Sequence, residues 1–477
     1  MTSPPASPLL VTPVPRDAPL PVSFTQQERL ETGRHVQLVN NKIPVALVFE
    51  GPLDVALLED CLETLGRRHE SLRLCFPENH PVGHVLEVQP DLVEPLRVVS
   101  VEDTAPSERF DRALALLAED AQRPFVLSAG ALFRRMVVRV DERTHVLCMT
   151  MDHVNIDALS VRVLIDELLT LYTARAKGEE PELPEQSVQF PDFAAWERRY
   201  LQGATLERLA GYWRKKLDGI DPIPASGLVD PAGGTDGPPK LVKLTTFVDA
   251  QRAATMDTLA QSVGTSLISV VGAAVKATVW HHRRAAEGDE AAGDVALFGS
   301  LGNRTRPETQ RLVGYLATVA TFRTVFEPTV TFEELVGRVG RTLWDAMRHQ
   351  RIPHSLIMKV LDHPQYGARY RDAAAMPSYL NFDVLDYGLS SFPQPPGLSV
   401  RRVVLPMPEV PRGGLRVLGL RRPDGISLEF RYRSDRYGRA WAQAFLADLD
   451  RALALGVAEP HLPIGRLFAS GGPAAGR

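Results

Sequence analysis

Short apolar runs alternate with stretches of helical periodicity along the first part of the chain. The run at 43–49 is rich in β-branched residues and predicts a strand. Asp54 then precedes apolar residues spaced three and four apart over 55–65, which predicts a helix with Asp54 as its N-cap. The apolar run at 72–76 predicts a return to a strand.

Two adjacent strands and a second helix follow. The runs at 133–140 and 145–152 are separated by a short polar turn, which favours neighbouring strands. Apolar residues at helical spacing over 161–171 predict a helix, with Ser160 as its N-cap. The polar, proline-containing stretch 174–189 then indicates a boundary between two lobes.

The second part of the chain also mixes helices and strands. Helices are predicted at 193–217, 267–279 and 440–455, a loop at 226–240, and strands at 295–301, 318–326, 378–384, 415–420 and 426–432. This mixed order in both parts predicts an α/β protein of two lobes. We expect a disordered proline-rich leader over 1–20, an N-terminal lobe over 21–180, a C-terminal lobe over 181–465 and a flexible tail over 466–477.

Composition narrows the class of protein. The 477 residues are 44% hydrophobic and carry a formal net charge of −4, without the basic face that a nucleic-acid binder needs. No apolar run is long enough to span a bilayer, and the N-terminus does not resemble a secretory signal. The three cysteines form no CxxC pair, so we expect a reduced, cytoplasmic protein with no metal site.

One segment combines groups suited to catalysis. His153 lies where a predicted strand passes into a loop, a common position for an exposed catalytic side chain. Its imidazole can exchange a proton near neutral pH, which suits attack of an amine or hydroxyl on a carbonyl. Asp157, four residues later, could orient that imidazole or brace the loop through a cation. Taken alone, a histidine and an aspartate at a strand end are more often structural than catalytic.

The segment resembles a family motif, and further motifs occur in the family's order. The sequence DHVNIDA at 152–158 is similar to the HHxxxDG motif of the condensation domains of nonribosomal peptide synthetases. Six further segments are similar to other motifs of these domains: VSFTQQERL at 22–30, RHESLRLCF at 68–76, PFVL at 124–127, FPDFAAW at 190–196, NRTRPETQRLVGYLATVATFR at 303–323 and HQRIPHSLI at 349–357. The resemblance extends over roughly 20–455, and it carries far more weight than any one motif.

The resemblance implies a fold, an activity and partners. Condensation domains are V-shaped pseudo-dimers of two chloramphenicol-acetyltransferase-like lobes with a central tunnel, in which His153 would lie. The implied function is that of a free-standing condensation enzyme. It would transfer an acyl or aminoacyl group from the phosphopantetheine thioester of a carrier protein to an amine or hydroxyl, forming an amide or an ester. The acceptor would be a small molecule or a second carrier-bound amino acid.

The same resemblance gives further expectations about partners and site residues. No adenylation or carrier-protein motif is present, so the carrier protein would act in trans, and no cofactor would be bound. We expect a monomer that binds neither nucleic acid nor membrane. Asp157 would pair with Arg304 and hold the loop of His153, a structural rather than a chemical role.

Several positions depart from the family pattern. Asp152 replaces the first motif histidine, and because neighbouring strand residues face opposite ways, it would support the loop rather than join the chemistry. Ala158 replaces the motif glycine, and Thr318 replaces an asparagine. These changes leave a second hypothesis open, a catalytically degenerate module that binds carrier proteins and recruits tailoring enzymes. Residues that could line the tunnel are Ala158, Ser160, Thr318 and Asn381.

Two variant activities also stay open. Asp152, Asp157 and Ser160 fit the DxxxxDxxS pattern of heterocyclisation domains, although those domains normally lack the histidine retained here as His153. Epimerisation is the other variant. The residues do not identify the donor, the acceptor or the bond formed.

Overall fold

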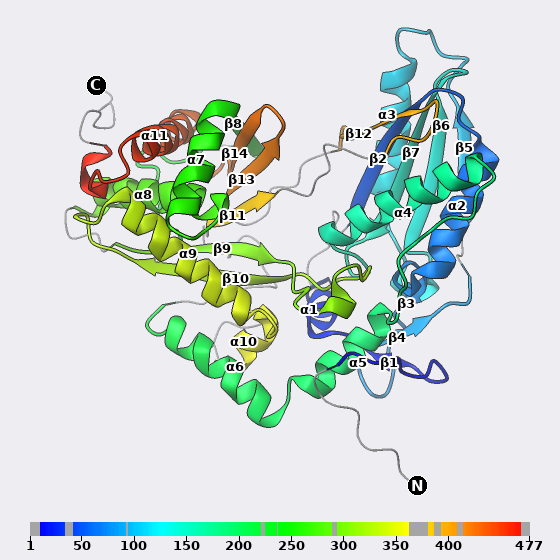
Figure 1. Ribbon diagram of the computed structural model, residues 1–477, viewed down its shortest axis with the longest axis horizontal. Helices are drawn as coiled ribbons and strands as arrows, with labels where there is room; N and C mark the ends of the chain where they lie inside the picture. The colour runs from blue at the N-terminus through cyan, green and yellow to red at the C-terminus, as the bar shows by residue number, and fades with distance from the viewer. Residues whose placement is uncertain are drawn as a thin grey trace. The chain divides into compact units, whose positions relative to one another are not determined.

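The computed structural model describes residues 10–33, 42–91, 94–220, 225–235, 237–288, 293–361, 380–385, 393–407 and 414–468 (Figure 1). The chain forms two compact units, each built from separated segments. The first contains Met1–Glu207, Gly302–Ala317 and Tyr387–Pro408, and the second contains Arg208–Leu301, Thr318–Asp386 and Glu409–Arg477. This division differs from the single boundary expected at 180–181, because two later segments return to the first unit.

The main sheet of the first unit has the strand order β12-β2-β7-β6-β5. Neighbouring strands are antiparallel, except that β5 and β6 are parallel. The bounds are β2 Lys42–Glu50, β5 Arg97–Ser100, β6 Phe133–Arg139, β7 Thr144–Asp152 and β12 Ser399–Val403. The predicted strands at 43–49, 133–140 and 145–152 are therefore confirmed, whereas β12 was not predicted.

Alternate residues of these strands are buried on opposite faces of the sheet. One face packs against α2 (Val55–Arg68) and α4 (Ala158–Ala176), with Leu47 and Met149 among its core residues. The other face, which includes Val48, packs against α3 (Arg109–Gln122). Burial on both faces explains why the strands are continuous apolar runs.

A smaller sheet and two helices complete the first unit. Its strand order is β1-β4-β3, with the bounds β1 Leu20–Pro21, β3 Leu74–Cys75 and β4 Val85–Val88. The short helix α1 (Phe24–Gly33) contacts α5 (Phe190–Tyr200), and α6 (Gly203–Lys216) follows along the chain.

The second unit is built on a sheet of order β10-β9-β11-β13-β14-β8. Strand β11 is parallel to both of its neighbours, and the other pairs are antiparallel. The strands are β8 Leu241–Asp249, β9 Asp294–Leu301, β10 Thr318–Val325, β11 Leu380–Leu385, β13 Leu415–Arg422 and β14 Gly425–Arg433. Helices α7 Ala250–Ser262, α8 Leu267–Glu287, α9 Phe332–Arg348 and α11 Arg439–Ala458 pack against the sheet, and α10 His354–Val360 follows α9 (Figure 1).

Two local predictions were wrong. The run at 72–76 is a strand only at Leu74–Cys75, because a 3-10 turn occupies Glu70–Arg73. Helix α4 has Asp157 rather than Ser160 as its N-cap, and the Asp157 side chain accepts a hydrogen bond from the Ser160 backbone N–H. The predicted strand at 378–384 is β11, of which 378–379 lie outside the described residues. Residues 1–9 of the expected leader and 469–477 of the expected tail also lie outside them. The rest of both segments is ordered, contrary to expectation: the backbone N–H groups of Val11 and Val14 donate to Glu308 and Asp192, and Leu467 is fully buried.

Within the described part of the chain, no single helix has both the length and the apolar content needed to cross a membrane. A pair taken together, Ala250–Ser262 with Leu267–Ala285, meets those two criteria across a bend of 98°.

Candidate functional site

The loop that carries His153 follows directly from the end of β7. The carboxylate of Asp152, the last strand residue, accepts a hydrogen bond from the Val154 backbone N–H at 2.9 Å. The His153 ring is held by its Nδ1, which lies 2.8 Å from the carbonyl oxygen of Ile156. A carbonyl can only accept, so Nδ1 carries the proton, and the Nε2 of the neutral ring carries the lone pair.

The charge state of His153 is fixed by its surroundings. Burial, followed by the positive charge of Arg29, lowers the pKa of His153 to about 3. The imidazole is therefore neutral at physiological pH. Such a weak base is better suited to accepting a hydrogen bond from a nucleophile than to removing its proton outright.

The ion pair expected from the resemblance is present, and both partners are buried. Arg304 Nη1 and Nη2 lie 2.9 Å from the two carboxylate oxygens of Asp157, and the two side chains are 6% and 2% exposed. The same carboxylate accepts from the backbone N–H groups of Ser160, Leu316 and Ala317 and from the Ser160 hydroxyl. Burial opposes ionisation of Asp157, but Arg304 and Ser160 outweigh it and hold its pKa below the usual value. Asp157 therefore braces the loop through a cation, while Ile156 orients the imidazole.

Ser160 joins this network to the returning segment Gly302–Ala317. Its hydroxyl lies 2.9 Å from the Gly314 carbonyl oxygen and accepts from the Gly314 N–H at 3.0 Å. Any side chain at position 314 would clash with Phe190, because a Cβ there would lie 2.1 Å from the Phe190 ring. Ser160 is fully buried. The expectation that it lines an open tunnel is therefore wrong, since its hydroxyl is used within the protein.

The other candidate lining residues differ in position. Ala158 is the first residue of α4 and is partly exposed. Thr318 and Asn381 belong to the second unit. The Thr318 hydroxyl accepts a hydrogen bond from the His354 backbone N–H at 3.2 Å. Asn381 lies on β11 opposite Arg416, and its buried Oδ1 has no hydrogen-bond partner among the described residues.

Three residues near His153 were not identified from the sequence. The Tyr315 ring lies 4.8 Å from the His153 ring, centroid to centroid, and Arg29 Cζ lies 5.6 Å from the Tyr315 centroid. Gln26 Nε2 donates to the Val154 carbonyl oxygen at 3.0 Å, which ties α1 to the loop. Gln26 also exchanges hydrogen bonds with Ser23 in a capping box, so the S-x-x-Q pattern could have indicated this helix start. Because Gln26 and Arg29 are three residues apart, they share one helix face.

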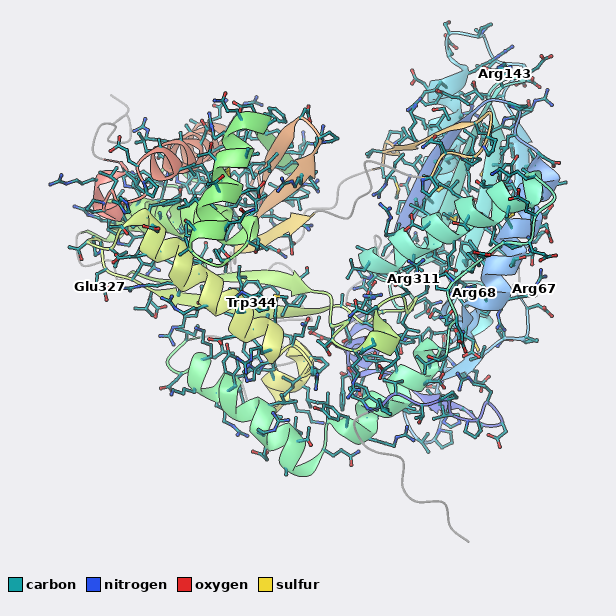
Figure 2. The ribbon with its side chains drawn as sticks, viewed as in Figure 1. Arg67, Arg68, Arg143, Arg311, Glu327 and Trp344 are labelled. Carbon is teal, nitrogen blue, oxygen red and sulfur yellow. The ribbon has the colours of Figure 1, made fainter. Side chains whose placement is uncertain are left out.

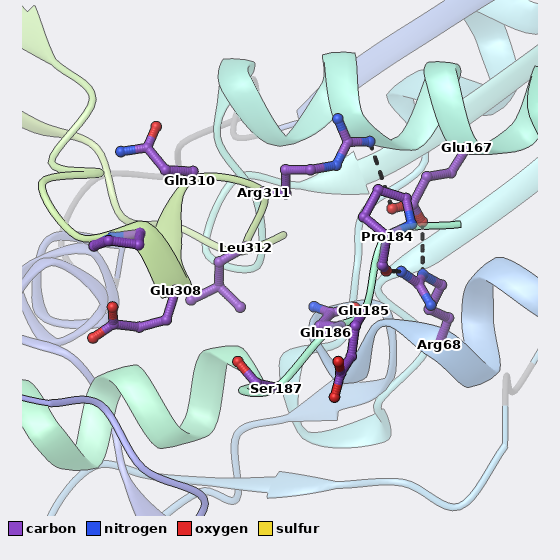
Figure 3. Close-up of a pocket in the computed structure, with 11 residues that line it drawn as sticks. Arg68, Glu167, Pro184, Glu185, Gln186, Ser187, Glu308, Gln310, Arg311 and Leu312 are labelled. Atoms are coloured by element: carbon purple, nitrogen blue, oxygen red, sulfur yellow. Dashed lines mark hydrogen bonds and ion pairs between the residues drawn. The ribbon is translucent and has the colours of Figure 1, made fainter. Parts of the chain in front are cut away.

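A cavity of about 290 Å³, with several charged side chains in its lining, lies elsewhere in the first unit (Figure 3). The carboxylate of Glu167 is buried. One of its oxygens lies 3.0 Å from Arg68 Nε and 2.7 Å from His69 Nε2, and the other lies 3.7 Å from Arg311 Nη2. Figure 3 shows Arg68 and Arg311 directed at Glu167. The cavity is lined by Arg68, Glu167, Pro184, Glu185, Gln186, Ser187, Pro307, Glu308, Gln310, Arg311 and Leu312, and none of the predicted site residues is among them.

Comparison with known proteins identifies the family of this chain. The model of the condensation domain matches residues 21–470, and the chain belongs to the condensation-domain family. A linear gramicidin synthase of Brevibacillus parabrevis is 32% identical over 357 residues, which cover 74% of this chain and 4% of that protein. The chain thus spans a small fraction of the length of this relative.

Two solved structures show the same fold. The X-domain in complex with OxyB from teicoplanin biosynthesis has a TM-score of 0.73 at 22% identity, covering 96% of this chain and 97% of that chain. A variant of the starter condensation domain of rhizomide synthetase, in complex with C8-CoA and Leu-SNAC, has a TM-score of 0.75 at 17% identity, covering 94% and 96%. The fold is therefore the chloramphenicol-acetyltransferase-like fold of condensation domains.

Proposed function

We propose that the protein is an acyltransferase that moves an acyl or aminoacyl group from a carrier-protein thioester to an amine or hydroxyl. The observation that carries this proposal is the state of His153, a neutral ring fixed through Nδ1 with Nε2 left as an acceptor. The loop is braced by a buried bidentate ion pair, so the imidazole is held in one orientation before any substrate binds.

The chemistry is a nucleophilic acyl substitution. The acceptor nitrogen or oxygen attacks the thioester carbonyl, forming a new C–N or C–O bond and a tetrahedral oxyanion. Collapse of the oxyanion breaks the C–S bond, and the proton lost by the nucleophile passes to the departing pantetheine thiolate. His153 Nε2 accepts a hydrogen bond from the nucleophile and orients it towards the carbonyl.

Two observations favour a second candidate, a module that binds carrier proteins and recruits a tailoring enzyme. The first motif position is Asp152, whose carboxylate serves the loop backbone, and the structurally similar X-domain was solved with OxyB. Under this proposal, His153 and its ion pair are structural residues of the family fold.

One experiment separates the two candidates. Acyl-loaded carrier protein is incubated with the protein and a panel of amines and alcohols, and intact-mass spectrometry follows loss of the acyl group from the pantetheine arm. Transfer by the wild type that fails in His153→Ala supports the acyltransferase. Carrier binding without transfer, equal in both proteins, supports the recruitment module and contradicts the enzyme.

A further inference from the structure

Arg29 presents a buried guanidinium edge that lacks an acceptor. Its Nε and Nη2 atoms are inaccessible to solvent, and neither has a hydrogen-bond partner among the described residues. In a guanidinium group, the Nε–H and the Nη2–H bonds point the same way and form one side-on fork. A buried donor without an acceptor is destabilising, and more so when it is charged, so two on one edge indicate a missing anion.

The fork matches one kind of anion particularly well. Two parallel N–H groups bind the two oxygens of a carboxylate at once, as Arg304 binds Asp157 in this protein. Among the described residues, no carboxylate is hydrogen-bonded to these two atoms. The side chain of Glu28 is close enough to Tyr315 to affect its pKa, but it is not bonded to these two atoms of Arg29.

We propose that the Nε/Nη2 edge of Arg29 binds a carboxylate of the acyl acceptor, next to the nucleophile that His153 orients. The identification of the ligand as an acceptor rests on the proposed function. The carboxylate comes either from a free amino acid or from the acidic side chain of a carrier-bound one.

The spacing around Tyr315 suits such an acceptor. Arg29 Cζ and the His153 ring lie 5.6 Å and 4.8 Å from the centroid of the same tyrosine ring. A hydrogen bond at each end takes up about 2.9 Å. Because both groups lie over the same ring, their separation is at most about 10 Å, so an acceptor that bonds to both carries its carboxylate only a few bonds from its nucleophile.

Carboxylate binding at Arg29 would also change the pKa of His153. The positive charge of Arg29 is the second cause, after burial, that holds down the pKa of His153. An anion on Arg29 offsets that charge, so the pKa of His153 rises when the acceptor is bound. The imidazole thus becomes a better proton acceptor only in the presence of its substrate.

The transfer test uses matched acceptors, an amino acid and its neutral primary amide, with wild type, Arg29→Gln and Arg29→Lys. The wild type should prefer the acid by about tenfold or more, as expected for one charge-assisted bidentate pair. Arg29→Gln should lose the preference, and Arg29→Lys, which keeps the charge without the fork, should keep part of it. Arg67→Gln, which removes an exposed guanidinium from α2 (Figure 2), is the matched control and should behave as wild type. An acid-to-amide ratio that is unchanged in Arg29→Gln overturns the proposal.

Two further experiments identify the source of the carboxylate and test binding at Arg29 without acyl transfer. If a tethered side chain supplies it, carrier-bound aspartate should be preferred over carrier-bound asparagine, again only with Arg29 present. Independently of transfer, acetate but not acetamide, at equal ionic strength, should raise the melting temperature of the wild type and the NMR-measured pKa of His153. Neither effect should occur in Arg29→Gln.

The two readouts distinguish the two possible failures. An acetate effect that depends on Arg29, without transfer to any acceptor, keeps the carboxylate site and contradicts the acyltransferase. Transfer without an acid preference and without an acetate effect keeps the acyltransferase and contradicts the carboxylate site.

Discussion

Removal of Arg304 is expected to destabilise the first unit by leaving Asp157 charged and buried. Arg304→Met keeps much of the side-chain volume but removes both hydrogen bonds to the carboxylate. Breaking a buried ion pair typically costs about 3–5 kcal/mol. Four other donors to Asp157 remain, from Ser160, Leu316 and Ala317, so we expect the lower end, about 3 kcal/mol.

The loss should depend on pH in a definite direction. In the wild type, the pKa of Asp157 is held below its unfolded value, so the pair stabilises the fold above about pH 4 and loses its effect as pH falls through the folded pKa. Without Arg304, burial dominates and the pKa of Asp157 rises. The variant can then neutralise the carboxylate by protonation, so its deficit should be largest near pH 7 and smaller near pH 4.

Urea unfolding at both pH values measures the deficit, and hydrogen exchange of peptides covering 153–160 and 312–317 locates it. The control is Arg162→Met, which removes a partly exposed i,i+4 partner of Asp166 on α4 and should cost about 0.5 kcal/mol or less. A loss for Arg304→Met no larger than this control, or one that grows as pH falls, would refute the reasoning.

Three further changes test the surroundings of the loop. Burial raises the pKa of Glu197, which accepts the Phe24 N–H at the start of α1, to about 7. The folded state holds this proton more tightly than the unfolded chain, so wild-type stability should fall between about pH 4.5 and pH 7. The side chain introduced by Glu197→Gln cannot titrate, so the free energy of unfolding of this variant should rise relative to that of the wild type over the same range. Denaturation experiments should show a relative gain of at most about 3 kcal/mol. Gln26→Leu removes the bonds to the Val154 carbonyl and the Ser23 N–H, so it should slow transfer, speed hydrogen exchange of the loop and cost about 1–3 kcal/mol of stability in denaturation experiments. Asp152→Asn keeps an acceptor for the Val154 N–H, so its transfer rate should stay within about threefold of the wild type, whereas a larger loss would give Asp152 a chemical role.

The sequence predicted those strands and helices whose apolar pattern is continuous within a short stretch of chain. The strands at 43–49 and 145–152 are continuous apolar runs because both faces of their sheet are covered, and the stripe after Asp54 forms α2 with the predicted cap. The edge strand β12 was missed because its sequence, SVRRV, is short and half polar. The cap of α4 was assigned to the wrong residue because Asp157 and Ser160 are both suitable capping residues three positions apart, and only the structure shows which side chain accepts.

The site itself was only partly predictable. The pair of Asp157 with Arg304 followed from the family resemblance, although the partners are 147 residues apart. Arg29 and Tyr315 lie within two of the family-like segments, 22–30 and 303–323, but neither segment indicated a role for them, because their proximity to His153 depends on the segment near residue 315 returning to α1. Their roles come from tertiary contacts that no local pattern records.

The most direct test of the central claim is the single-turnover rate of acyl transfer from loaded carrier protein for wild type and His153→Ala, with carrier affinity and melting temperature measured in parallel. We predict that the variant binds the carrier normally and transfers about 10² times more slowly, the loss typical when a nucleophile is no longer held in its attacking orientation. An unchanged transfer rate in a folded variant would contradict a mechanism centred on His153.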